Sequence, residues 1–179
     1  SEEERLREKV KRVEDDLRRL NEEYKEKHKR SEERNKKLLK DLKEVHDRVK
    51  KAVEDILRDT PLEEEKLRTI REDLKRVHEE NKEAEERIRK RHEELNEESR
   101  RDHKRHKEKL DRLKEEEEKS DRPEEEVEER IRRALKESRE EIDRLERRNE
   151  EEDKKSEETV RRMMERNDRV LKEVEERAR

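Results

Sequence analysis

The sequence predicts an all-α protein, a single-chain antiparallel three-helix bundle of long, nearly straight helices. Charged residues make up 66% of the 179 residues, aromatic residues 1%, and glycine is absent. This composition lacks the turn and strand formers that sheets require. The only two prolines, Pro61 and Pro123, divide the chain into three nearly equal segments. Within each segment, apolar residues recur every three or four positions, as they do on one face of an α-helix.

The first helix is expected at about residues 2–58. Ser1 is followed three residues later by Glu4, the spacing of a capping box at a helix start. Opposite charges three or four residues apart favour helix along the whole segment. The apolar face carries Val13, Leu17, Leu20, Tyr24, Leu38, Leu42, Val45, Val49, Val53 and Ile56.

The second helix is expected at about residues 61–118. Thr60 has the character of an N-cap, Pro61 suits the first helical position, and Glu63 stands three residues after the cap. The apolar face carries Leu67, Ile70, Leu74, Val77, Ala84, Ile88, Leu95, Leu110 and Leu113.

The third helix is expected at about residues 122–177, with Asp121 as its cap and Glu124 three residues later. Its apolar face carries Val127, Ile131, Leu135, Ile142, Leu145, Val160, Met163, Val170 and Val174. Because the connections are short, neighbouring helices must be antiparallel, and residues 1–179 are expected to form one domain.

The apolar face repeats every 18 residues, as at Val127, Leu145 and Met163. Eighteen residues make five turns of a straight α-helix, so this face stays aligned without a supercoil. The sequence therefore predicts a nearly untwisted bundle with small crossing angles.

The face turns polar in its middle, with no apolar residue at 25–37 or 146–159. If the hairpins turn near residues 60 and 121, residue i of the first helix lies level with residue 121 − i of the second and 121 + i of the third. This register groups His28 with His92 and Asn149, His46 with His78 and Asn167, and Ser31 with Asn35, Asp153 and Ser156. A paired polar network across three helices fixes their register, because a slip leaves buried groups unpaired. We therefore interpret these ten residues as a structural network.

The histidines have alternative roles besides this structural one. Protonation near pH 6 could open the bundle, which makes a pH switch an alternative. His103 and His106 have a spacing that can hold zinc, but only Ser138 is polar opposite them, so a network or solvated role is preferred. Ser31 and His28 share a helix face without an oxyanion site. We therefore predict no catalytic, metal or cofactor-binding residue, no cofactor and no enzyme activity.

The sequence also supports expectations about binding partners and location. No apolar run exceeds two residues, so we expect a soluble chain without a membrane span or targeting signal, cytoplasmic if expressed in a host. The chain has 57 basic and 61 acidic residues interleaved throughout, which disfavours nucleic acid binding. With no cysteine, disulfides and thiolate chemistry are excluded. We expect no required partner and no small-molecule substrate.

The chain resembles de novo designed helical bundles with buried hydrogen-bond networks. The resemblance rests on the Ser-Glu-Glu start, the turns containing Pro61 and Pro123, the Glu/Lys/Arg surface and the polar layers between apolar ones. It implies a structural scaffold without natural activity or natural location. The alternative is an interaction module, a helical subunit of a designed homo- or hetero-oligomer that could respond to pH. A single-helix spacer is disfavoured, because spacers lack a continuous apolar face.

Overall fold

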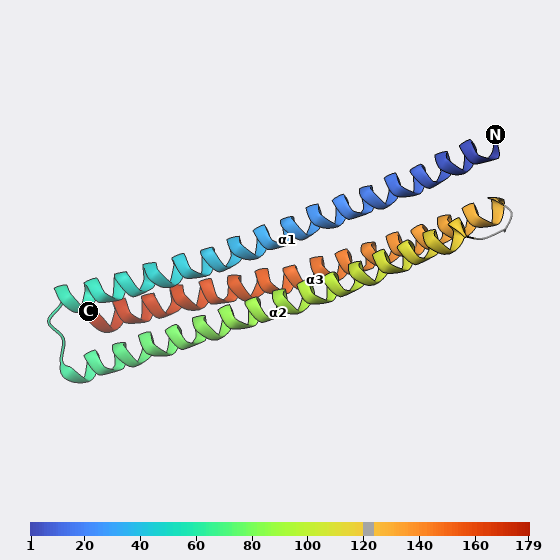
Figure 1. The fold of residues 1–179 in the computed structure, drawn as a ribbon. Helices are drawn as coiled ribbons and strands as arrows, with labels where there is room; N and C mark the ends of the chain where they lie inside the picture. Colours follow the sequence, from blue (N-terminus) through green and yellow to red (C-terminus); the bar gives the residue numbers. More distant parts are fainter. Residues whose placement is uncertain (120–123) are drawn as a thin grey trace. The chain divides into compact units, whose positions relative to one another are not determined.

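The structure is a computed structural model that describes residues 1–119 and 124–179, with the side chains of all of these except residues 3, 6, 10, 117 and 124. It contains three long helices, α1 (Glu2–Asp59), α2 (Glu64–Glu118) and α3 (Glu124–Ala178), which are labelled in Figure 1. The helices pack against each other, and the described residues form no strand. The prediction of an all-α three-helix bundle is confirmed. The cap predicted at Asp121, Pro123 and the predicted start of the third helix at residue 122 lie outside the described residues.

The start of α1 has the cap that its sequence predicts. The backbone N–H of Glu4 donates to Oγ of Ser1 at 3.3 Å, and the Glu4 carboxylate lies 3.7 Å from the terminal ammonium of Ser1. The cap satisfies one of the backbone donors that every helix start leaves without an intrahelical acceptor.

The connection between α1 and α2 differs from the prediction. Thr60 donates its N–H to the carbonyl of Ile56 and therefore closes α1, and α2 begins at Glu64, with its first turn closed by a bond from Leu67 to the carbonyl of Glu63. The predicted cap at Thr60 is wrong. Pro61 disfavours helical backbone in the residue before it, which accounts for the end of α1 at Asp59. The late start of α2 shows that Pro61 does not occupy the first helical position.

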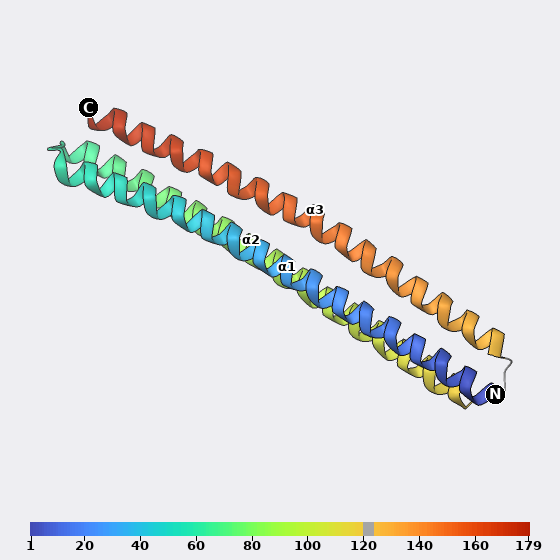
Figure 2. The same ribbon diagram turned by 90° about the horizontal axis from the view of Figure 1, so that it is seen from above.

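The chain divides into two compact units. Unit 1 consists of Ser1–Ser31 and Glu94–Glu150, and unit 2 of Glu32–Glu93 and Glu151–Arg179. Each unit contains one stretch of each helix. In unit 2, the last part of α3, drawn in red, runs alongside α1 and α2 in both views (Figures 1 and 2).

Contacts within unit 1 define the directions of the helices. Lys114 of α2 pairs with Glu14 of α1, whereas His103 stacks on Tyr24, so α2 runs antiparallel to α1. Lys27 of α1 lies 2.6 Å from Glu146 of α3, and Lys9 lies 3.1 Å from Glu128, so these two helices are parallel.

Unit 2 contains two clusters of buried apolar side chains. The first, called cluster A, consists of Val49, Val53, Ile70, Val77, Val170 and Val174. The second, called cluster B, consists of Leu42, Ala84, Ile88, Val160 and Met163. Both draw residues from all three helices. Each fully buried valine or isoleucine side chain stabilises the folded state by about 1.5–3 kcal/mol relative to an exposed one.

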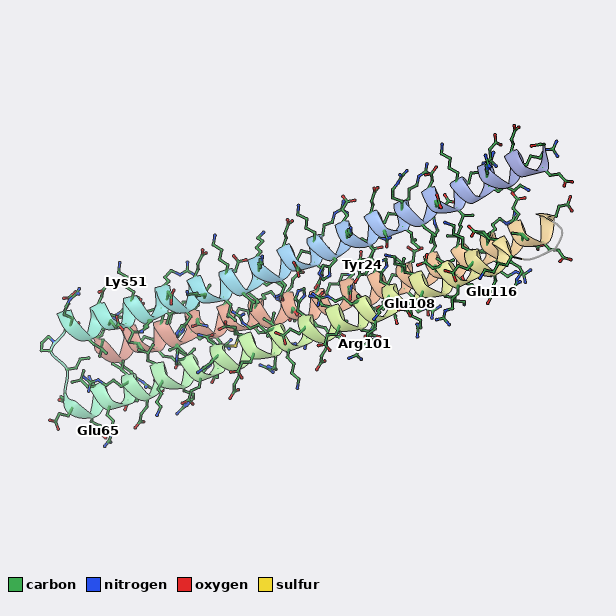
Figure 3. The ribbon with its side chains drawn as sticks, viewed as in Figure 1. Tyr24, Lys51, Glu65, Arg101, Glu108 and Glu116 are labelled. Carbon is green, nitrogen blue, oxygen red and sulfur yellow. The ribbon has the colours of Figure 1, made fainter. Side chains whose placement is uncertain are left out.

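Charged side chains occupy the outer faces of the helices. Lys51 and Glu65 are exposed and point outward, whereas Tyr24 lies on the side of α1 that faces the other helices (Figure 3). Ion pairs between helices border the core, as between Arg166 and Glu80 at 3.0 Å in unit 2. Because such pairs are partly exposed, each contributes little to stability.

Candidate functional site

The most complete polar arrangement is a layer in unit 2 that we call the His–Asn layer, formed by His46 of α1, His78 and Asn81 of α2, and Asn167 of α3. Nε2 of His46 lies 2.7 Å from Nδ1 of His78, and Nδ1 of His46 lies 2.8 Å from Nδ2 of Asn81. Asn81 and Asn167 exchange two amide hydrogen bonds, of 3.0 and 2.8 Å. The layer thus connects all three helices through side chains alone.

Helical spacing brings these side chains together. His78 and Asn81 are three residues apart and share one face of α2. Asn167 stands in the buried series of α3 between Met163 and Val170, and its side chain is fully buried, with 0% exposure. Its Nδ2 also donates to the carbonyl of Met163 at 2.6 Å, so both of its amide hydrogens are bonded.

The His–Asn layer lies between the two apolar clusters of unit 2. Along α3, Met163 of cluster B precedes Asn167, and Val170 of cluster A follows it. An amide in such surroundings costs several kcal/mol unless it is paired. The complete pairing of Asn167 is therefore what makes its burial tolerable.

Burial lowers the pKa of His46 below its ordinary value of about 6.5. The neighbouring His78 and Lys50 act in the same direction, and Asp47 opposes them. The neutral imidazole is consequently the form that this layer favours.

The sequence placed three members of the layer at one level but missed Asn81. The predicted register set His46 level with residue 75 and grouped it with the nearby His78. In the structure His46 lies against His78 and also against Asn81, further along α2. The connection explains the shift, because α2 begins at Glu64 and the hairpin therefore turns later than residue 60. Asn167 bonds to His46 only through Asn81.

The second predicted layer, of His28, His92 and Asn149, is divided between the units. His28 and Asn149 belong to unit 1, and His92 belongs to unit 2. His28 stacks on Tyr24 with ring centroids 6.2 Å apart, and Oδ1 of Asn149 is buried without a hydrogen-bond partner. Their grouping as one layer stays a prediction.

The third predicted group, of Ser31, Asn35, Asp153 and Ser156, includes arginine partners that the sequence analysis did not anticipate. Ser31 is buried in unit 1, and the other three belong to unit 2, where Asn35 is half-buried. Arg34 lies 2.9 Å from the carboxylate of Asp153, and Arg91 donates to Oγ of Ser156 at 3.5 Å. Arginine is effective here because its planar group presents five donors on a long side chain.

Unit 1 contains a second aromatic and polar group around Tyr24. The ring of His103 stacks on Tyr24, with centroids 4.1 Å apart and an interplanar angle of 3°. The Tyr24 hydroxyl is buried without a hydrogen-bond partner, and burial raises its pKa, an effect that Arg100 opposes. Burial also lowers the pKa of His103, helped by Lys107, His106 and Lys25.

His106 has polar neighbours on both sides of its ring. Its Nδ1 lies 3.3 Å from Oγ of Ser138, and its Nε2 contacts the carboxylate of Glu141. A hydroxyl, an imidazole and a carboxylate in series are also the components of a nucleophilic triad. Ser138, however, is only 2% exposed, so its hydroxyl is buried away from any dissolved substrate.

His103 and His106, considered above as zinc ligands, have these different partners. Among the residues that the structure describes, no group of three or more His, Asp or Glu side chains could hold a metal ion. Within the same residues, no helix is both long and apolar enough to cross a membrane. Comparison of the chain with protein-family models, curated proteins and solved structures finds no match.

Proposed function

We propose that the chain is a designed structural scaffold without catalytic activity or a required partner, in which buried polar side chains set the register of the three helices. The proposal rests on one observation above all, the reciprocal bonds between Asn81 and Asn167 inside an apolar core. Long helices of similar length with highly charged outer faces support the same conclusion.

Apolar layers alone define register poorly, because valine, leucine and isoleucine pack acceptably after a slip of one turn. A shift of α3 by one turn along α2 would instead leave the amides of Asn81 and Asn167 buried and unpaired. Each unpaired buried group costs about 1–3 kcal/mol. Slipped arrangements are thus disfavoured even though the correct one gains little from the bonds themselves.

The test compares two variants. Asn167→Leu leaves Asn81 without its partner on α3 and is expected to lower the free energy of unfolding by about 1–3 kcal/mol. The double variant Asn81→Leu with Asn167→Leu replaces both amides and, of their bonds to other side chains, loses only the one to the half-buried His46, so it should be more stable than Asn167→Leu alone. It should also populate more than one register or mass, observed as doubled amide signals and as species other than 22.5 kDa in light scattering.

Asn149→Leu provides the matched control, because it makes the same change on α3 at an amide whose Oδ1 is unbonded. It should leave one set of signals and one mass. If the double variant also remains a single species in one register, the polar pair does not specify register and the proposal fails. A parent mass two or three times 22.5 kDa would instead favour an oligomer subunit.

A further inference from the structure

The backbone carbonyl of Met163 determines the orientation of every polar group in the His–Asn layer. A carbonyl can only accept, so the group of Asn167 that lies 2.6 Å from it must be the amide NH₂. Oδ1 of Asn167 then faces Asn81 and accepts from Nδ2 of that residue. The reciprocal bond from Nδ2 of Asn167 fixes the amide of Asn81 in the same way.

The amide orientation of Asn81 also determines where the two histidines carry their protons. The remaining hydrogen of Asn81 Nδ2 points at Nδ1 of His46, which must accept it. Neutral His46 therefore carries its proton on Nε2 and donates it to Nδ1 of His78. His78 in turn carries its proton on Nε2, and its side chain is exposed.

This chain of donors has no acceptor left for an additional proton. A proton on Nδ1 of His46 would oppose the amide hydrogen of Asn81, and a proton on Nδ1 of His78 would oppose the Nε2 hydrogen of His46. Reversing the donors would require both asparagines to flip, which would place Oδ1 of Asn167 against the carbonyl of Met163.

Both bonds that a proton would break connect α1 to α2. His46 is the only member of the layer on α1, and the bonds of Asn81 to Asn167 connect α2 to α3 without titratable groups. We infer that the layer is an acid-sensitive contact between helices: proton uptake weakens the attachment of α1 to α2, while the pairing of α2 with α3 is retained. This inference concerns the layer alone and stands apart from the proposed role of the scaffold.

The charges around the layer agree with this assignment. On α1, Lys50 disfavours and Asp47 favours a cationic His46, and from α2 the ring of His78 disfavours it. From α3, the uncharged Asn167 faces the layer, and Arg166 at the same level is paired with Glu80 of α2. Burial, with His78 and Lys50, lowers the pKa of His46 against the opposing effect of Asp47, so the folded layer resists protonation.

The first experiment reads the tautomers in the unmodified protein. Nitrogen-15 chemical shifts of the imidazoles at pH 8 should show His46 and His78 both protonated on Nε2. A proton on Nδ1 of either ring would overturn the inference, and this result needs no variant.

The second experiment follows amide exchange, as protection factors, from pH 7.5 to 5.5. Protection of α1 at residues 43–50 should fall by about tenfold. One imidazole changes an opening equilibrium by at most about tenfold per pH unit, and about one unit of this range lies below the ordinary histidine pKa of about 6.5. Protection of α3 at residues 163–171 should change by less than about twofold over the same range. An equal loss in both segments, or no loss in α1, contradicts the inference.

Variants separate the layer from the other histidines. The double variant His46→Gln with His78→Gln should abolish the difference between α1 and α3 below pH 6.5. The matched control His103→Gln, in unit 1, should leave that difference in place. A difference that persists in the double variant would assign the acid response to other groups and overturn the role of the layer.

Discussion

Unit 1 and unit 2 are built from the same three helices, yet the space between the helices is filled differently. Of the fifteen apolar side chains that are buried in the described part of the chain, twelve belong to unit 2 and three, Leu20, Leu110 and Ile142, belong to unit 1. In unit 2 the central amides are fully bonded, whereas unit 1 buries the Tyr24 hydroxyl and Oδ1 of Asn149 without hydrogen-bond partners.

The difference indicates that helix formation and helix packing are separate contributions to stability in this chain. Both units consist of strongly helix-forming sequence, but among the described residues the extended apolar clusters lie in unit 2. Regions with few buried apolar contacts open at lower free energy than the global transition. We therefore expect unit 1 to open first and unit 2 to determine the last step of unfolding.

The largest expected effect comes from a cavity in cluster A. Ile70→Ala removes a side chain with 0% exposure and should lower the free energy of unfolding by about 2–5 kcal/mol, as measured by chemical denaturation. Leu20→Ala in unit 1 is the matched control, and its cost should fall at the low end of that range. An equal or larger cost at Leu20 would show that the two units are equally well packed.

A smaller effect, of opposite sign, is expected at Tyr24. Tyr24→Phe keeps the stacking on His103 but removes the buried hydroxyl that has no partner, so it should raise the free energy of unfolding by about 1 kcal/mol. Tyr24→Leu, which loses the ring as well, should not give this gain. A loss of stability in the phenylalanine variant would mean that the hydroxyl is satisfied in solution.

Acid should weaken unit 1 through His103. Its pKa is lowered in the folded state, so the unfolded chain takes up the proton first, and stability falls as the pH drops below about 6.5. The loss ends once the pH is below the folded-state pKa. Amide exchange in unit 1 should show that the stability of His103→Gln falls less with acid than that of the parent. The difference in free energy should be smaller than the Tyr24 effect, because solvent screens this half-buried ring. An unchanged pH profile would contradict this assignment.

The smallest effect is expected from the exposed charges of either unit. Arg30→Ala removes a 2.8 Å pair with Glu26 on the surface of α1, where both side chains are 65% exposed. The expected cost is below about 0.5 kcal/mol in thermal or chemical denaturation. A cost above 1 kcal/mol would show that surface charges contribute materially to the packing of unit 1.

The helices and their apolar faces could be predicted because the spacing of apolar residues and the positions of prolines and capping residues are local properties of the sequence. The contacts between helices were harder to predict, because they depend on where each hairpin turns. The predicted contact of His46 with His78 is present, but the start of α2 at Glu64 shifts the register enough to add Asn81, which was not predicted. The partners of Asp153 and Ser156 were missed for another reason, since the long side chains of Arg34 and Arg91 reach them from positions outside the apolar face.

Cluster A also constrains the time course of synthesis. It joins Val49, Ile70 and Val77 to Val170 and Val174, so it cannot close until the ribosome has added the 93 residues (170 minus 77) from Val77 to Val170. At ordinary rates of translation this takes about 5–20 s. During that interval the valine and isoleucine faces of the first hairpin are open to neighbouring nascent chains, and the arrival of the last valines ends their exposure.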